Sequence, residues 1–273
     1  MSDARPTLGI IGYGNMGRAL ALGVSGNERL NREFALAVYE KNPAAAAAAA
    51  ASGIFCAQTA QDLAGDADFV LIAVKPRHVG DLLREIEPKL QKDQLLLSIA
   101  AGVSLDFLRE HSKGRCPAAR IMPNTPALVG RGIFGLCFGP GVPEKKQEAV
   151  RGLLKELGLL IEVDEGRMSA MTALSGSGPG YVFHFLESLA EAGVSVGLDR
   201  ADAAAIALEL LRGSAEMAAQ SGLHPAILRE QVASPAGTTI AGINLLDRGG
   251  ARGLLVDAVR AAYDRSLEME KNA

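Results

Sequence analysis

The chain has 273 residues, of which 48% are hydrophobic and 4% aromatic, and it can bury one large core or two modest ones. Its formal net charge is −3 and its charged side chains are interspersed without a Lys/Arg-rich run, so we expect no nucleic-acid partner. No apolar run approaches the ~18 residues of a membrane span and no charged and apolar leader precedes the first apolar run, which predicts a cytoplasmic protein without membrane contact.

Near the start of the chain, an apolar run leads directly into a glycine-rich turn and then into a helical pattern. The turn has the spacing G-x-G-x-x-G, which is the dinucleotide fingerprint when a strand precedes it and a helix follows. Gly12 permits the tight turn, Gly14 lets a pyrophosphate approach the backbone, and Gly17 lets the helix pack on the sheet. We therefore predict a dinucleotide site here, with Asn15 and Met16 as further cofactor contacts.

From residue 7 to about 164, apolar strands alternate with helical segments, which is typical of a mostly parallel, doubly wound sheet. We expect strands at residues 8–11, 34–39, 69–74, 95–99, 118–122, 133–138 and 159–163. Helices are expected at residues 44–51, 77–86 and 144–157 among others. The predicted fold class is therefore α/β, with an N-terminal Rossmann-type domain over residues 1–164.

The loop after the second expected strand contains conflicting signals for the choice of cofactor. Glu40 lies where an acidic residue would accept a hydrogen bond from the 2′-hydroxyl of NAD, whereas Lys41 and Asn42 could receive the 2′-phosphate of NADP.

Two later loops, at residues 73–76 and 121–126, also follow expected strands and should face the same crevice. Their prolines enforce turns and extended backbone, so each loop could also be only a structural turn. The candidate cofactor residues in these loops are Val74, Lys75, Pro76, Met122, Pro123, Asn124 and Thr125.

After about residue 165 the strand pattern disappears, and helices are expected at residues 181–196, 201–219, 225–232, 239–246 and 253–270. The segment 201–219 has Ala, Ile and Leu around most of its circumference. Because so few helices can hardly bury such a segment within one chain, we predict an all-helical dimerisation and substrate domain over residues 165–273. An obligate homodimer or larger homo-oligomer follows.

Within this half, residues 234–239 read Ser-Pro-Ala-Gly-Thr-Thr and precede an apolar-periodic run. The Pro-Ala-Gly turn cannot continue a preceding helix, and it delivers backbone N–H groups and two threonine hydroxyls to the next helix start. A small carboxylate would fit there, although Ser234 or Thr238 could instead serve only as a helix cap.

The cysteines, Cys56, Cys116 and Cys137, are scattered without C-x-x-C spacing, and the four histidines are equally dispersed. We expect reduced thiols to which no chemistry is assigned, and no metal site.

Taken together, these motifs closely resemble those of the pyrroline-5-carboxylate reductase family, in the family's order and over essentially the whole chain. The resemblance rests on the motifs at residues 12–17, 73–76, 98–103, 122–127, 175–179 and 228–250. Two positions depart from it: Ala236 stands where the family usually has glycine, and Gly180 stands where it usually has alanine. A Cβ at position 236 forbids any turn conformation that only glycine tolerates.

The resemblance implies an NAD(P)H-dependent oxidoreductase that transfers hydride to the C5 imine carbon of 1-pyrroline-5-carboxylate and gives L-proline, the last step of proline biosynthesis. Thr238 is then the expected catalytic donor beside the ring nitrogen, and the site is completed across a subunit boundary. The implied substrate-binding residues are Ser175, Gly178, Pro179, Ser234, Gly237, Thr238 and Thr239.

The resemblance also adds Ala100 to the cofactor residues and places residues 122–125 beside the nicotinamide. Together with Lys41 it favours NADP. NADH stays possible, because members that use NADPH commonly have small polar residues where this chain has Glu40.

Two rival functions remain open. A β-hydroxyacid dehydrogenase would carry a catalytic lysine on its first long helix after the nucleotide domain, but residues 181–186 contain none. A non-catalytic nucleotide-binding regulator would have no reason to keep residues 234–239.

Overall fold

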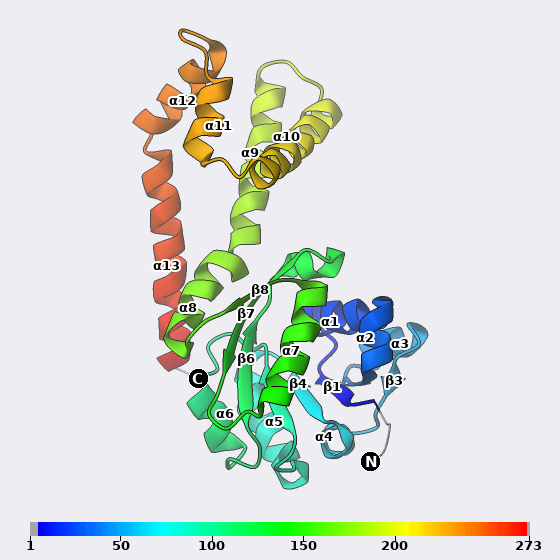
Figure 1. Ribbon diagram of the computed structural model, residues 1–273. Helices are drawn as coiled ribbons and strands as arrows, with labels where there is room; N and C mark the ends of the chain where they lie inside the picture. Colours follow the sequence, from blue (N-terminus) through cyan, green and yellow to red (C-terminus); the bar gives the residue numbers. More distant parts are fainter. Residues whose placement is uncertain (1–4, 272–273) are drawn as a thin grey trace. The chain divides into compact units, whose positions relative to one another are not determined.

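A computed structural model describes residues 5–271 (Figure 1). The chain forms two compact units, of which the second is Gly178–Ala261 and the first comprises the residues before and after that segment. The domain boundary expected at residue 164 lies close to the end of the last strand. The first unit extends beyond this boundary, to Ser177. The reason is that residues up to Ser177, and the last turns of the C-terminal helix, pack with the sheet.

The first unit contains one eight-stranded sheet in the order β3-β2-β1-β4-β5-β6-β7-β8. Only the β6–β7 pair is antiparallel, so the expected mostly parallel Rossmann-type sheet is confirmed. The strands are β1 (Thr7–Ile11), β2 (Ala35–Tyr39), β3 (Phe55–Cys56), β4 (Phe69–Ile72), β5 (Leu95–Ser98), β6 (Ala118–Met122), β7 (Gly132–Phe138) and β8 (Gly158–Glu162). The edge strand β3 escaped the sequence pattern because two residues cannot show an alternation.

The helices of this unit follow the local signals in the sequence. Asn42 caps α3, because its side chain accepts hydrogen bonds from the N–H groups of Ala44 and Ala45, and Pro43 occupies the first helical position. A short 3-10 turn, Pro76–His78, precedes α5. The helices are α1 (Asn15–Gly26), α2 (Glu28–Glu33), α3 (Pro43–Ala51), α4 (Ala60–Asp66), α5 (Val79–Ile86), α6 (Leu105–His111), α7 (Glu144–Leu157) and α8 (Met168–Met171).

Two hydrophobic clusters cover the two faces of the sheet, as a parallel sheet requires. Side chains alternate along β1, so that Ile10 belongs to one cluster and Ile11 to the other. Helices α1, α2 and α7 contribute to the first cluster, and α4, α5 and α6 to the second. This burial leaves the carboxyl ends of the strands as the edge where loops are free to form a site.

The second unit consists of helices, as expected. They are α9 (Gly178–Ser195), α10 (Arg200–Ser221), α11 (Pro225–Val232), α12 (Thr238–Arg248) and the first part of α13 (Ala251–Lys271). Helix α10 buries only Ala203 and Ala207. By contrast, Ile206 and Leu210 of α10 and Phe183 of α9 are each more than half exposed. Among residues 5–271, none of the helices has the length and apolar character needed to cross a membrane.

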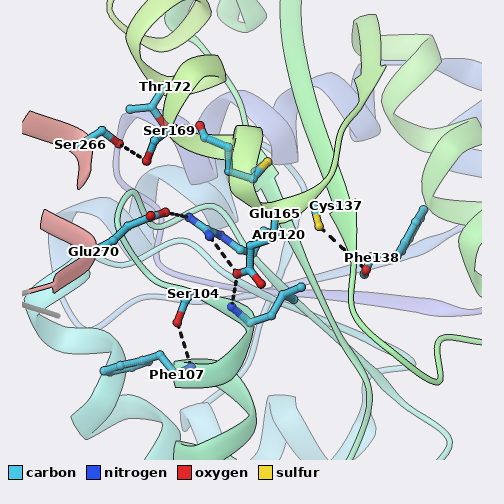
Figure 2. A network of polar contacts seen from close by, with 12 residues as sticks. Ser104, Phe107, Arg120, Cys137, Phe138, Glu165, Ser169, Thr172, Ser266 and Glu270 are labelled. Carbon is cyan, nitrogen blue, oxygen red and sulfur yellow. Dashed lines mark hydrogen bonds and ion pairs between the residues drawn. The ribbon is translucent and has the colours of Figure 1, made fainter. Parts of the chain in front are cut away.

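A buried ion-pair network joins the last turns of α13 to the sheet of the first unit (Figure 2). Arg120 in β6 donates to Glu165 Oε1 at 2.9 Å and to Glu270 Oε1 at 2.7 Å. One turn before Glu270, the hydroxyl of Ser266 donates to the Ser169 hydroxyl at 3.0 Å. These long-range contacts explain why the end of α13 belongs to the first unit.

Candidate active site

The glycine-rich turn after β1 has the geometry that its sequence predicted. Gly12 has a φ of +106°, and a Cβ there would lie 2.8 Å from the carbonyl oxygen of Ala73. A Cβ on Gly17 would overlap the carbonyl oxygen of Gly12, whereas one on Gly14 would meet no atom within 4 Å. The turn is thus closed toward the sheet and open at Gly14, where a phosphate can approach.

A cleft of about 740 Å³ opens beside this turn at the carboxyl ends of β1, β2, β4 and β5. It brings together ten of the predicted cofactor residues, namely Gly12, Gly14, Asn15, Met16, Glu40, Lys41, Val74, Lys75, Pro76 and Ala100. The α5 side adds His78, Asp81 and Glu85, which the sequence reading missed. In the sequence, these three residues were indicated only by their position within about ten residues of the Val74–Pro76 turn.

Three features make this cleft fit a dinucleotide. Helix α1 has Gly14 at its N-cap and no acidic residue in its first turn, so its first N–H groups receive no side-chain cap. Such a helix start favours an anion through both its N–H groups and its dipole. The open position at Gly14 leaves room for the pyrophosphate, and Glu40 stands at the end of β2 where a ribose would lie.

The Glu40 carboxylate is held inside the cleft by two backbone groups. Its Oε2 accepts from the N–H of Tyr13 at 2.7 Å, and its Oε1 accepts from the N–H of Asn42 at 2.8 Å. Glu40 is half-buried, and its carboxylate is turned toward the glycine-rich turn. The Asn42 side chain caps α3 through its Oδ1, which accepts from the N–H groups of Ala44 and Ala45.

The loop after β6 does not line the cleft but packs on a π-helical turn, Thr172–Gly176. Asn124 is 5% exposed, and its Nδ2 donates to the Ser175 carbonyl at 3.1 Å. Its Oδ1 accepts from the N–H of Ile133 at 2.8 Å. Beside this amide, a Cβ on Gly176 would lie 2.6 Å from Met122 Cε. The predicted nicotinamide loop and the start of the predicted substrate wall are therefore in contact.

In the second unit, residues 234–237 form the turn before α12. Ala236 has a φ of +58°, and the N–H of Gly237 donates to the Ser234 carbonyl at 3.0 Å. Gly237 is the N-cap of α12, and no side chain caps the helix there. The alternative in which Ser234 or Thr238 serves only as a cap is therefore not the observed arrangement. Thr238 and Thr239 occupy the first two helical positions.

Burial raises the pKa of the Cys116 thiol to about 11, and it also raises the pKa of the Cys137 thiol. Both are therefore neutral thiols near neutral pH and poor nucleophiles. Within the described residues, no group of three or more His, Cys, Asp and Glu side chains could hold a metal ion.

The fold and the glycine-rich cleft define a dinucleotide-binding oxidoreductase with a second, helical unit. Residues 165–269 match the family model described as pyrroline-5-carboxylate reductase dimerisation, and residues 7–102 match a model described as NADP oxidoreductase coenzyme F420-dependent. The chain belongs to the pyrroline-5-carboxylate reductase family.

Relatives with this name support the assignment over nearly the full length. Pyrroline-5-carboxylate reductase of Pisum sativum is 39% identical over 263 residues, which is 96% of either chain. The solved structure of the Coxiella burnetii enzyme is similar with a TM-score of 0.89 and 30% identity, over 97% of this chain and 99% of that one. The Plasmodium falciparum pyrroline carboxylate reductase, solved with NADP bound, has a TM-score of 0.86 and 31% identity, over 99% of each chain.

Proposed function

We propose that this chain reduces 1-pyrroline-5-carboxylate to L-proline with a reduced nicotinamide cofactor. The observation that carries the proposal is the uncapped start of α12 at Gly237 in a chain of this family. A helix start without a side-chain cap offers backbone N–H groups and a positive dipole end to a small carboxylate.

The reaction requires the protein to orient the imine, whose nitrogen gains one proton from the solvent as C5 gains the hydride. The reduced nicotinamide provides the hydride that forms the new C–H bond at C5. The N–H groups around Gly237 and Thr238, with Ser234, bind the carboxylate, and the Thr238 hydroxyl donates a hydrogen bond to the ring nitrogen. That nitrogen gains electron density as the C=N double bond becomes a single bond, so a donor there stabilises the transition state.

The remaining site residues take the places that the family resemblance implied. Residues 175–179 and Thr239 bind the substrate, and residues 122–125 flank the nicotinamide. The contact of Asn124 with Ser175 supports this arrangement, because it shows that the two segments share one packed region.

For the cofactor, we propose that both NADPH and NADH are accepted. Lys41 lines the cleft and can attract a 2′-phosphate. Glu40, held toward the glycine-rich turn, offers its oxygens to a 2′-hydroxyl and repels a 2′-phosphate. Lys41 thus favours NADPH and Glu40 favours NADH, so the loop admits both cofactors.

We further propose that the active form is a homodimer or a dimer-based assembly in the cytoplasm. The matched dimerisation model and the exposed apolar side chains of α9 and α10 support self-association.

The test combines a substrate panel with one variant. The purified protein should oxidise a reduced nicotinamide in the presence of the imine, and it should not turn over 3-hydroxy acids with the oxidised cofactor. Turnover of a 3-hydroxy acid without turnover of the imine would show a β-hydroxyacid dehydrogenase. Cofactor binding without turnover of either substrate would show a non-catalytic regulator.

Thr238→Ala should lower turnover of the imine by roughly ten- to a thousand-fold, as expected for the loss of one transition-state hydrogen bond. Thr59→Ala is the matched control, since Thr59 stands at the start of α4 and its hydroxyl only accepts from the Asp62 N–H. Equal rates in the two variants would remove Thr238 from the mechanism.

A further inference from the structure

The Ser175 carbonyl cannot accept the hydrogen bond that a regular α-helix would give it. An α-helical bond to this carbonyl would come from the N–H of residue 179, which is a proline and has none. The structure places the side-chain amide of Asn124 there instead, with its Nδ2 at 3.1 Å. The Asn124 side chain thus provides a donor to this carbonyl, although the two residues are 51 positions apart in the sequence.

We propose that Asn124 is a positioning residue that sets the substrate wall at residues 175–179 relative to the nicotinamide loop at residues 122–125. This inference rests on the proposed function. Asn124 is part of the loop after β6, and the N–H of Ile133 on β7 holds its Oδ1 at 2.8 Å. One end of the amide is therefore fixed to the sheet, and the other end holds the π-helical turn.

The side chains around the Asn124 amide are closely packed, so a displacement of the Ser175 segment also displaces the neighbouring loop. Met122 contacts Gly176 so closely that a Cβ on this glycine would lie 2.6 Å from Met122 Cε. Single π-helical turns tend to occur at functional sites, where they shift the groups that follow them. A change in the Asn124–Ser175 bond therefore moves the wall against the loop, and hydride transfer is sensitive to displacements of about 1 Å.

The diagnostic variant is Asn124→Asp, because it keeps the size and the oxygen that Ile133 requires while removing the donor to Ser175. The new carboxylate oxygen would face the Ser175 carbonyl and repel it. We expect kcat for the imine to fall about tenfold or more, while the cofactor dissociation constant stays within about threefold, since the cleft that binds the dinucleotide is unchanged.

Gln94→Glu provides the matched control. Gln94 is 4% exposed, its Nε2 donates to the carbonyls of Ala64 and Ala67, and its Oε1 accepts from the N–H of Gln91. It therefore makes the same kind of buried contacts as Asn124, but it precedes β5 at the edge of the sheet opposite the cleft. Both variants should lose thermal stability, whereas Gln94→Glu should keep kcat per folded molecule within about twofold.

A kcat of Asn124→Asp within about twofold of that of Gln94→Glu would overturn the proposal, because the amide would then serve only the fold. If Asn124→Asp does not fold, Asn124→Ala and Gln94→Ala give the same comparison without a buried charge. An inactive wild-type protein would reject the proposed function, and this inference with it. An active wild type with equal variants would reject this inference alone.

Discussion

At Ala236 the backbone adopts a φ of +58°, a left-handed conformation that costs a residue with a Cβ about 1–2 kcal/mol. The family usually has glycine here, so this chain keeps the turn geometry at a conformational cost. Ala236→Gly should therefore raise the free energy of unfolding by about 1 kcal/mol, measured by urea denaturation.

Ala241→Gly is the control for this prediction. Ala241 lies inside α12, where glycine lowers helix stability by about 1 kcal/mol, so the sign of the change should reverse. A loss of stability in both variants would show that the turn at position 236 is not strained.

A second prediction at the residue scale concerns Glu40, whose two oxygens accept from the backbone N–H groups of Tyr13 and Asn42. Glu40→Ser removes the negative charge near the expected 2′-position, so the ratio of kcat/KM for NADPH to that for NADH should rise about tenfold. Glu33→Ser, on the surface at the end of α2, should leave the ratio unchanged. An unaltered ratio in Glu40→Ser would remove this carboxylate from cofactor choice.

At the scale of elements, Arg120 holds the last turns of α13 on the sheet. Its side chain is 6% exposed, while those of Glu165 and Glu270 are 37% and 24% exposed. Arg120→Met should lower the free energy of unfolding by about 3 kcal/mol, because both carboxylates lose their partner but keep some contact with water. Hydrogen exchange should accelerate selectively in the last turns of α13.

The control for Arg120 is Arg265→Met, which breaks only a surface pair with Glu268 and should cost less than about 1 kcal/mol. Equal losses in the two variants, or unchanged exchange in α13, would contradict this role of Arg120.

Cys116 is a buried residue shortly before β6, and burial raises the pKa of its thiol to about 11 from 9.0. The folded protein holds this thiol proton more tightly than the unfolded chain does. The contribution of the protonated thiol to the free energy of unfolding is therefore complete below pH 9, and it is lost as the pH rises toward 11. The wild type should lose about 2 kcal/mol more over this interval than Cys116→Ala, measured by urea denaturation at each pH. Parallel stability curves for the two proteins would contradict the assignment.

Much of the element order could be predicted because its signals are local. The glycine-rich turn after β1, the Asn42 cap and the helix over Glu144–Leu157 are written in adjacent residues. The extent of the first unit could not be predicted, since it depends on ion pairs such as that of Arg120 with Glu270, whose partners are 150 positions apart.

The residues of the candidate site likewise fall into those that local sequence signals predict and those that they do not. Nine residues that line the cleft could be predicted from the turns that follow strands, because parallel topology brings those turns to one edge. The role of Asn124 required coordinates, since nothing in the sequence says which acceptor its side-chain amide reaches. For Asn124 one signal was present: Pro179 removes an N–H four residues after Ser175.

For the whole molecule, the first unit contains the nucleotide cleft and the second unit contains the helix start at Gly237. Apolar side chains on the second unit, such as Phe183 and Ile206, are 61% and 52% exposed in the single chain. Residues 165–269 match a dimerisation model, so the proposed homodimer would bury these side chains.

The most direct test of this reaction is the amount of proline formed per reduced nicotinamide oxidised, measured by amino-acid analysis of the mixture of purified protein, 1-pyrroline-5-carboxylate and NADPH or NADH. We expect one proline for each nicotinamide oxidised, and none when the imine is omitted. Nicotinamide oxidation without proline, or no oxidation with either cofactor, would contradict the proposed imine reduction.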